Sequence, residues 1–110
     1  MRSKELLRQA IKDLEIGCYD KAVSAAYFAV RRAAEDLLMR LGEHIPRRDD
    51  KLANAIENKG LVEVADILRM LYSYRKDADY GEWVTGEIAV RCVRDAERAL
   101  NTLLRIVEGI

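Results

Sequence analysis

Apolar residues recur at spacings of three and four along most of this chain, which is the period of an amphipathic helix. This period predicts five helices separated by short polar breaks. The expected ranges are Ser3 to Ile16; Lys21 to Leu41; a short helix from Asp49 or Asp50 through Ile56; a fourth helix whose apolar stripe begins at Leu61; and a fifth from Thr85 nearly to the C-terminus.

Residues that cap helices stand close to these breaks. Ser3, Asp20 and Thr85 are suitable N-caps, because their side-chain oxygens can accept hydrogen bonds from free backbone N–H groups. Gly17 and Gly42 follow the first two helices, where a residue with positive φ commonly ends a helix. The caps therefore support the helix ranges that the apolar period predicts.

The second helix is the expected centre of the core, since alanines alternate there with large apolar residues, Phe28 among them. Small residues allow neighbouring helices to approach closely. Short connections between long helices favour antiparallel neighbours. We therefore expect an all-α fold in one domain over residues 1–110, an up-and-down antiparallel bundle of four long helices with one short insert helix.

Composition agrees with an all-α chain. Half of the 110 residues are apolar, only 6% are aromatic, and there is a single proline. The 19 basic and 19 acidic residues give a net charge of zero. A zero net charge argues against a protein that coats nucleic acid without selectivity.

Cysteine and histidine are too few for a zinc site. Cys18, Cys92 and His44 show no paired ligand spacing, so we expect no metal and no cofactor. A disulfide between the two cysteines stays open, but free thiols in a reducing compartment fit a helical, core-rich chain better. No segment is long and apolar enough to span a membrane, and the expected location is cytoplasmic.

Arg75 stands out because it continues the apolar stripe of the fourth helix, four residues after Leu71 and three after Tyr72. Its guanidinium is therefore directed toward the packed side of a helix. A buried charge is costly unless it is paired. We expect a carboxylate, a backbone carbonyl or a ligand anion to contact it.

The fourth helix also has a second apolar flank, formed by Val62, Ile67, Met70 and Tyr74. A helix that is apolar on two flanks needs a second surface to pack on. The favoured explanation is a two-fold homodimer. The alternative is that the first or the third helix covers this flank.

Two segments resemble motifs of the HEPN domain family (higher eukaryotes and prokaryotes nucleotide-binding). The second helix, with Ala25-Ala26-Tyr27-Phe28-Ala29 and Ala33-Ala34-Glu35-Asp36-Leu37-Leu38 after Gly17-Cys18-Tyr19-Asp20, is similar to "G-x-Y-D … A-Y-Y-A … A-A-E-x-L-L". The segment Arg75-Lys76-Asp77-Ala78-Asp79-Tyr80 looks like the "R-x-x-A-D-Y" motif of small stand-alone prokaryotic members. The resemblance covers nearly the whole chain.

The resemblance implies a dimeric helical bundle that binds RNA or a nucleotide or partners a small nucleotidyltransferase as a toxin and antitoxin pair. Many members are metal-independent ribonucleases with an R-x4-6-H motif. Here Arg75 matches the arginine, but Tyr80 stands at the histidine position. A phenol with a pKa of about 10 is a weak general base at neutral pH. Tyr80 is alternatively a packing residue that closes the helix end.

Glu35 has two interpretations. Tyr27, Arg31 and Glu35 form one polar stripe on the second helix, at i, i+4 and i+8. Glu35 either orients Arg75 across the bundle, leaving Arg31 or Arg32 for a phosphate, or pairs with an arginine of its own helix.

Other charged residues are expected to be solvated. Asp49-Asp50 follow Arg47-Arg48 directly and cancel their local field. The arginines of the fifth helix alternate with acids and predict an ion-paired surface. His44 is expected to be an exposed loop residue.

Two functions follow from these residues. The first is a dimeric binding module in which Arg31, Arg75, Asp79 and Tyr80 recognise a phosphate, supported by Tyr27 and Glu35. The alternative is a variant metal-independent ribonuclease that uses Arg75 with Tyr80 or Asp79 as catalytic residues. The missing motif histidine favours the binding module.

Overall fold

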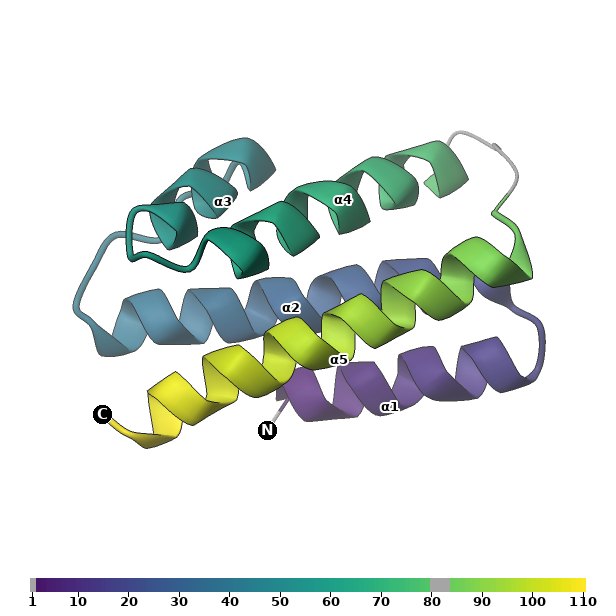
Figure 1. Ribbon diagram of the computed structural model, residues 1–110, viewed down its shortest axis with the longest axis horizontal. Coiled ribbons are helices and arrows are strands. Elements are labelled where there is room, and N and C mark those ends of the chain that lie inside the picture. Colours follow the sequence, from purple (N-terminus) through teal and green to yellow (C-terminus); the bar gives the residue numbers. More distant parts are fainter. Residues whose placement is uncertain (1, 80–83) are drawn as a thin grey trace.

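The computed structural model describes residues 2–79 and 84–110. Within these ranges the chain forms five helices and no strand, as the sequence predicts (Figure 1). The helices are α1 (Arg2–Glu15), α2 (Tyr19–Arg40), α3 (Asp49–Glu57), α4 (Val62–Asp79) and α5 (Gly86–Glu108).

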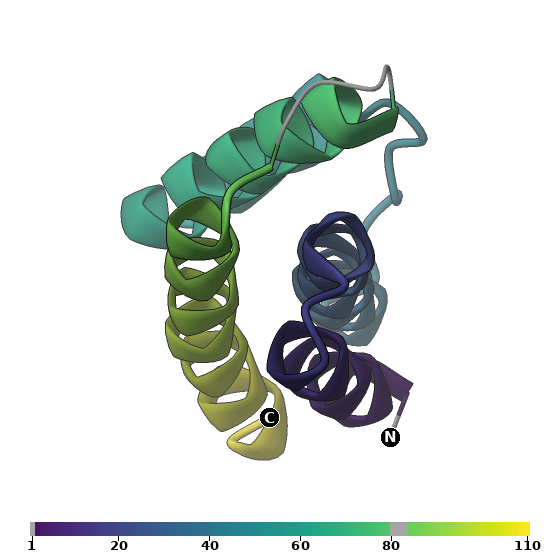
Figure 2. The ribbon, with the colours of Figure 1, turned by 90° about the vertical axis from the view of Figure 1, so that its right-hand side faces the viewer.

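The four long helices run alternately up and down, and α2 lies at the centre of the bundle. It packs against α1, α4 and α5 (Figures 1 and 2). Alanines at 22, 26, 29, 33 and 34 are fully buried on α2, which explains how three helices approach it so closely. This arrangement confirms the expected up-and-down bundle.

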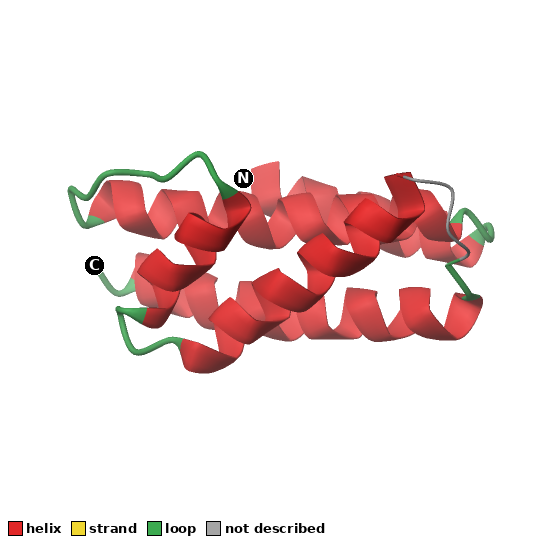
Figure 3. Ribbon diagram, turned by 90° about the horizontal axis from the view of Figure 1, so that it is seen from above, coloured by secondary structure: helices red, strands yellow, loops and turns green. Residues whose placement is uncertain are grey.

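The short helix α3 packs mainly on α4 (Figure 3). Seen from above, α4 crosses the other long helices obliquely. The oblique crossing lays the C-terminal part of α4, with Arg75, over the N-terminal half of α2. This contact forms the candidate site described below.

Two expected N-caps are wrong, and both residues lie inside a helix. Ser3 belongs to α1 and is fully buried, and its Oγ has no hydrogen-bond partner among the described residues. Asp20 lies in the first turn of α2, and Cys18 is the N-cap instead. A carboxylate in the first turn interacts favourably with the helix dipole, which accounts for Asp20 without a capping role.

Other helix ends agree with the sequence. Thr85 caps α5, and its Oγ1 accepts a hydrogen bond from the Ile88 N–H at 3.2 Å. Gly17 follows α1 with φ of +80°, and the next N–H, of Cys18, bonds back to the Asp13 carbonyl at 2.8 Å. This is the pattern in which glycine is favoured, because other residues rarely adopt positive φ.

The second flank of α4 is only partly open. Ile67 is buried within the chain itself, so the expectation that the whole flank awaits a partner is wrong for this residue. Val62 is 53% exposed, and Met70 and Tyr74 are half-buried. An apolar strip therefore still faces outward along α4.

Cys18 and Cys92 are free thiols, and Cys92 is fully buried on α5. Burial raises the pKa of the Cys92 thiol to about 11. None of the helices described combines the length and apolar character needed to cross a bilayer. Across residues 2–79 and 84–110, no group of three His, Cys, Asp or Glu side chains is placed to hold a metal ion.

Candidate functional site

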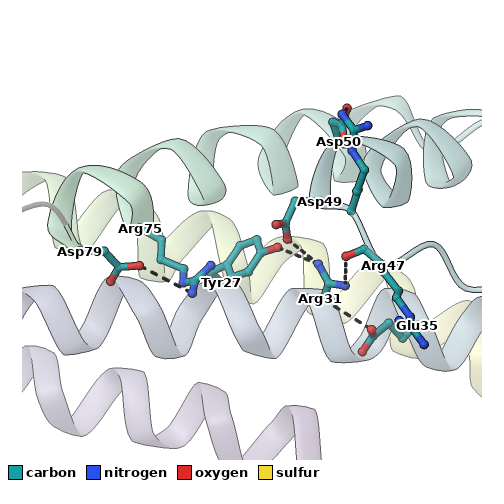
Figure 4. A network of polar contacts seen from close by, with 9 residues as sticks. Tyr27, Arg31, Glu35, Arg47, Asp49, Asp50, Arg75 and Asp79 are labelled. Carbon is teal, nitrogen blue, oxygen red and sulfur yellow. Dashed lines mark hydrogen bonds and ion pairs between the residues drawn. The ribbon is translucent and has the colours of Figure 1, made fainter.

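Polar side chains form a row along α2 beneath α3 and α4. Figure 4 shows Asp79, Arg75, Tyr27, Arg31 and Glu35 following one another along this helix. On α2 the row consists of Tyr27, Arg31 and Glu35, which share one side of the helix because they are four residues apart. Two arginines, one from α2 and one from α4, are its cations.

Arg31 is the better enclosed of the two, with a side chain only 15% exposed. It forms an ion pair with Asp49 at the start of α3 and lies 3.4 Å from Glu35. Its guanidinium also donates to the Arg47 carbonyl at 3.0 Å and to the Tyr27 hydroxyl at 3.2 Å. The donors of Arg31 are therefore largely occupied by groups of the chain itself.

Arg75 has a different environment. Its guanidinium carbon lies 4.8 Å from the centre of the Phe28 ring and 5.4 Å from that of Tyr27. Its one ion pair in the described chain is with Asp79, one turn later, at 3.6 Å. The side chain is 27% exposed, and its Nε is buried without a hydrogen-bond partner among the described residues.

Tyr27 joins the two arginines. It is only 1% exposed, its ring lies against Arg75, and its hydroxyl accepts from Arg31. Neighbouring rings hold it in place, with centroids 5.3 Å away in Phe28 and 5.9 Å away in Tyr72. One buried side chain therefore contacts both arginines.

Asp49, at the start of α3, is one of the two carboxylates that contact Arg31. Burial raises the pKa of Asp49, and the positive charge of Arg75 acts in the opposite direction. The direct contact with Arg31 also favours the ionised form, because a guanidinium stabilises a neighbouring carboxylate. We therefore treat Arg31 and Asp49 as a charged pair.

A groove with a volume of about 340 Å³ opens beside this row, between α1 and α2. Its lining residues are mostly charged, with Phe28 and Leu6 as the apolar members. They are Arg2, Leu6, Phe28, Arg31, Arg32 and Glu35. Phe28 is 38% exposed and borders both the groove and the Arg75 guanidinium.

Comparison with known proteins agrees with this architecture. The family model described as HEPN domain matches residues 1–108. The chain belongs to the HEPN domain family. It is also similar to a UPF0332 protein of Archaeoglobus fulgidus, with 26% identity over 102 residues, which covers 87% of this chain and 82% of that protein.

The HEPN motif residues are only partly brought together. Arg75, Asp79, Tyr27 and Arg31 lie in one row. That residues of this row bind a phosphate stays a prediction. Of the two interpretations of Glu35, pairing on its own helix is correct, since its partner is Arg31 rather than Arg75. Tyr80 lies outside the described residues, so the role predicted for it stays a prediction.

His44 is an exposed residue of the loop after α2, as expected. Figure 1 shows that this loop leaves the C-terminal end of α2, whereas Arg75 lies over the N-terminal half of that helix.

The expected ion-paired surface of α5 is also present. Arg98 contacts Glu63 at 2.7 Å and Asp95 at 3.2 Å.

Sequence reasoning missed two residues of this candidate site. Phe28 was expected in the core but is partly exposed. The signal was its spacing, because Phe28, Arg31, Arg32 and Glu35 fall at i, i+3, i+4 and i+7 and so share one polar face. Asp49 was expected to be solvated, and no local pattern reveals its contact with Arg31, which is 18 residues away in sequence.

Proposed function

We propose that this HEPN chain is a binding module that recognises a phosphate group of a nucleotide or RNA through Arg75. The observation that carries the proposal is the difference between the two arginines of the row. Arg31 is engaged by two carboxylates, a carbonyl and a hydroxyl. Within residues 2–79 and 84–110, Arg75 has a single ion pair, at 3.6 Å, and otherwise lies on aromatic rings.

Stacking leaves the hydrogen-bonding capacity of an arginine unused. A guanidinium carries five N–H donors in its plane, and contact with an aromatic ring uses its face. Arg75 therefore keeps in-plane donors for a planar or tetrahedral anion. Phosphate, like a carboxylate, is an anion that an arginine fork matches with two parallel hydrogen bonds.

The remaining residues have supporting roles in this proposal. Tyr27 and Phe28 of α2 hold the Arg75 guanidinium through their rings, and Asp79, which lies on α4 with Arg75, limits its motion through an ion pair. Asp79 is 54% exposed, so a phosphate can displace it from Arg75 at little cost. Arg31, which Glu35 contacts, donates to the Tyr27 hydroxyl, so this proposal gives Arg31 a supporting role in place of the phosphate-binding role expected from the sequence.

Binding of a fluorescein-labelled single-stranded RNA decamer, followed by fluorescence anisotropy, tests the proposal. Arg75→Ala should weaken binding at least about tenfold, the loss expected for a charge-assisted hydrogen bond. The matched control is Arg105→Ala, which removes an exposed arginine of α5 and should change the affinity less than twofold. Equal affinities for wild type and Arg75→Ala would overturn the proposal.

The proposal includes a homodimer formed along α4. A second groove, of about 630 Å³, runs between α4 and α5 beside Val62, Ile67 and Met70, with Glu63 and Asp66 on α4 and Arg91 and Arg98 on α5. Glu63 already pairs with Arg98 at 2.7 Å and Asp66 with Arg69 at 3.1 Å, so the apolar residues Val62 and Met70, rather than these charges, support a two-fold interface. A nucleotidyltransferase partner remains a prediction from the family resemblance.

A further inference from the structure

We infer that Arg75 and the groove between α1 and α2 form one continuous track for a single-stranded oligonucleotide of at least two nucleotides. The inference rests on the proposed function of Arg75. It adds a second phosphate site, made by Arg2 and Arg32, and assigns Phe28 as the ring between the two sites.

The charge of the groove favours an anion. Three arginines line it against one glutamate, Glu35. Arg31 is shared by Glu35, 3.4 Å away, and Asp49, so the positive charge of the groove comes from Arg2 and Arg32. Arg2 and Arg32 are exposed, and neither has an ion pair within residues 2–79 and 84–110. These two cations are available to a phosphate because no carboxylate of the described part of the chain pairs with them.

Phe28 makes the groove continuous with Arg75. The same ring lines the groove and lies 4.8 Å from the Arg75 guanidinium carbon. It is 38% exposed, although it belongs to the central helix of the bundle. An exposed aromatic ring between cations is the arrangement with which proteins hold single strands, since bases stack on rings while arginines follow the phosphates.

The arrangement predicts that binding depends on ligand length. A mononucleotide can reach only one of the two phosphate sites at a time. A longer strand can place one phosphate at Arg75 and another at Arg2 and Arg32, with a base against Phe28. A duplex is a poor ligand, because its bases are already stacked and do not reach the ring.

The experiment measures the affinity of uridine monophosphate and of labelled single-stranded oligonucleotides of two, four and ten residues, as RNA and as DNA. Affinity should rise at least about tenfold from the mononucleotide to the tetranucleotide. Arg32→Ala should weaken tetranucleotide binding several-fold and mononucleotide binding by a smaller factor, because a mononucleotide bound at Arg75 does not use Arg32. Arg40→Ala, which removes another exposed arginine of α2, serves as the matched control and should have no effect.

The outcomes separate this inference from the proposed function. Binding that depends on Arg75 but not on ligand length or on Arg32 would overturn the track and leave the Arg75 site intact. Binding that depends on Arg32 but not on Arg75 would overturn both. Phe28→Leu adds an independent readout, since loss of the ring should reduce the quenching of a 2-aminopurine base placed within the tetranucleotide. Unchanged quenching would contradict the role of Phe28.

Discussion

Arg31 on α2 and Asp49 at the start of α3 form an ion pair that ties the insert helix to the central helix. Neither side chain is fully solvated, with 15% of Arg31 and 24% of Asp49 exposed. A second, neighbouring ion pair provides a comparison. Arg48 and Asp50 also pair, at 2.9 Å, but are 71% and 61% exposed.

The first prediction compares these two pairs. Asp49→Ala should lower the free energy of unfolding by about 1.5–3 kcal/mol, because the partly buried Arg31 guanidinium loses the closer of its two carboxylate partners. Asp50→Ala should cost less than about 1 kcal/mol, since its pair is exposed. Both aspartates lie in the first turn of α3, so their effects on the helix dipole are matched. Urea unfolding followed by circular dichroism measures the difference, and equal losses would contradict the structural role of Asp49.

Arg75 is the subject of the second prediction. Truncating one partner of a fully buried ion pair lowers the free energy of unfolding by several kcal/mol. Asp79 is more than half exposed, so its contact with Arg75 contributes little to that free energy. Contacts with two rings remain, each worth about 0.5–1 kcal/mol. Arg75→Ala should therefore cost about 1–2 kcal/mol in thermal or urea unfolding, against almost nothing for Arg105→Ala. A loss above about 4 kcal/mol would mean that Arg75 has a structural role that this geometry does not explain.

The helices could be predicted from sequence because their signals are local. The apolar period and Thr85 place α5 almost correctly, and Gly17 marks the end of α1. The predictions of N-caps at Ser3 and Asp20 are wrong because the residue types that cap a helix are also accepted inside its first turn. A local pattern cannot decide between these two positions.

The site was harder to predict because its contacts join different helices. The sequence placed Arg75 on the packed side of α4, and it does lie against Tyr27 and Phe28. Which carboxylate each arginine meets depends on how α2 and α4 rotate relative to each other. That rotation pairs Glu35 with Arg31 rather than with Arg75, and no spacing along the chain specifies it.

Cys92 provides a prediction of pH dependence. Burial raises the pKa of its thiol from 9.0 to about 11. The folded chain therefore keeps this group neutral at a pH where the unfolded chain ionises it. The resulting stability is fully present below about pH 9 and is lost as the pH rises toward 11. The loss is of the order of 1–3 kcal/mol, since one pKa unit corresponds to about 1.4 kcal/mol.

Other groups also titrate in this range, so the measurement compares wild type with Cys92→Ala. The free energy of unfolding of wild type should fall more steeply between pH 8.5 and 10.5 than that of the variant. Parallel pH profiles would show that the Cys92 thiol does not contribute.

The proposed homodimer gives the fourth prediction. Light scattering at micromolar concentration should report about 25 kDa, twice the chain mass of 12.6 kDa. Met70→Glu should shift the mass toward the monomer, because it places a charge on the outward strip of α4 beside Val62. Leu41→Glu changes an exposed leucine at the C-terminal end of α2 and is the matched control. A monomeric wild type at this concentration would exclude a standard interface of about 1,600 Å².

The last prediction concerns RNA cleavage. We expect little or no metal-independent ribonuclease activity, because Tyr80 stands where the R-x4-6-H motif has its histidine and the chain's one histidine, His44, lies in the loop after α2. Positioned acid and base catalysis is typically worth about 10²–10⁴ in rate. The assay incubates the protein with single-stranded RNA in EDTA, beside Arg75→Ala and Tyr80→His.

The two variants separate binding from catalysis. Gain of cleavage by Tyr80→His, lost again when Arg75→Ala is added, would indicate that the chain orients RNA correctly and lacks only its general base. Efficient cleavage by wild type that is lost with Arg75→Ala would instead identify a variant ribonuclease. The base would then be Tyr80 or Asp79, and Asp79→Asn distinguishes them, because an amide keeps the size of the carboxylate but cannot accept a proton at neutral pH.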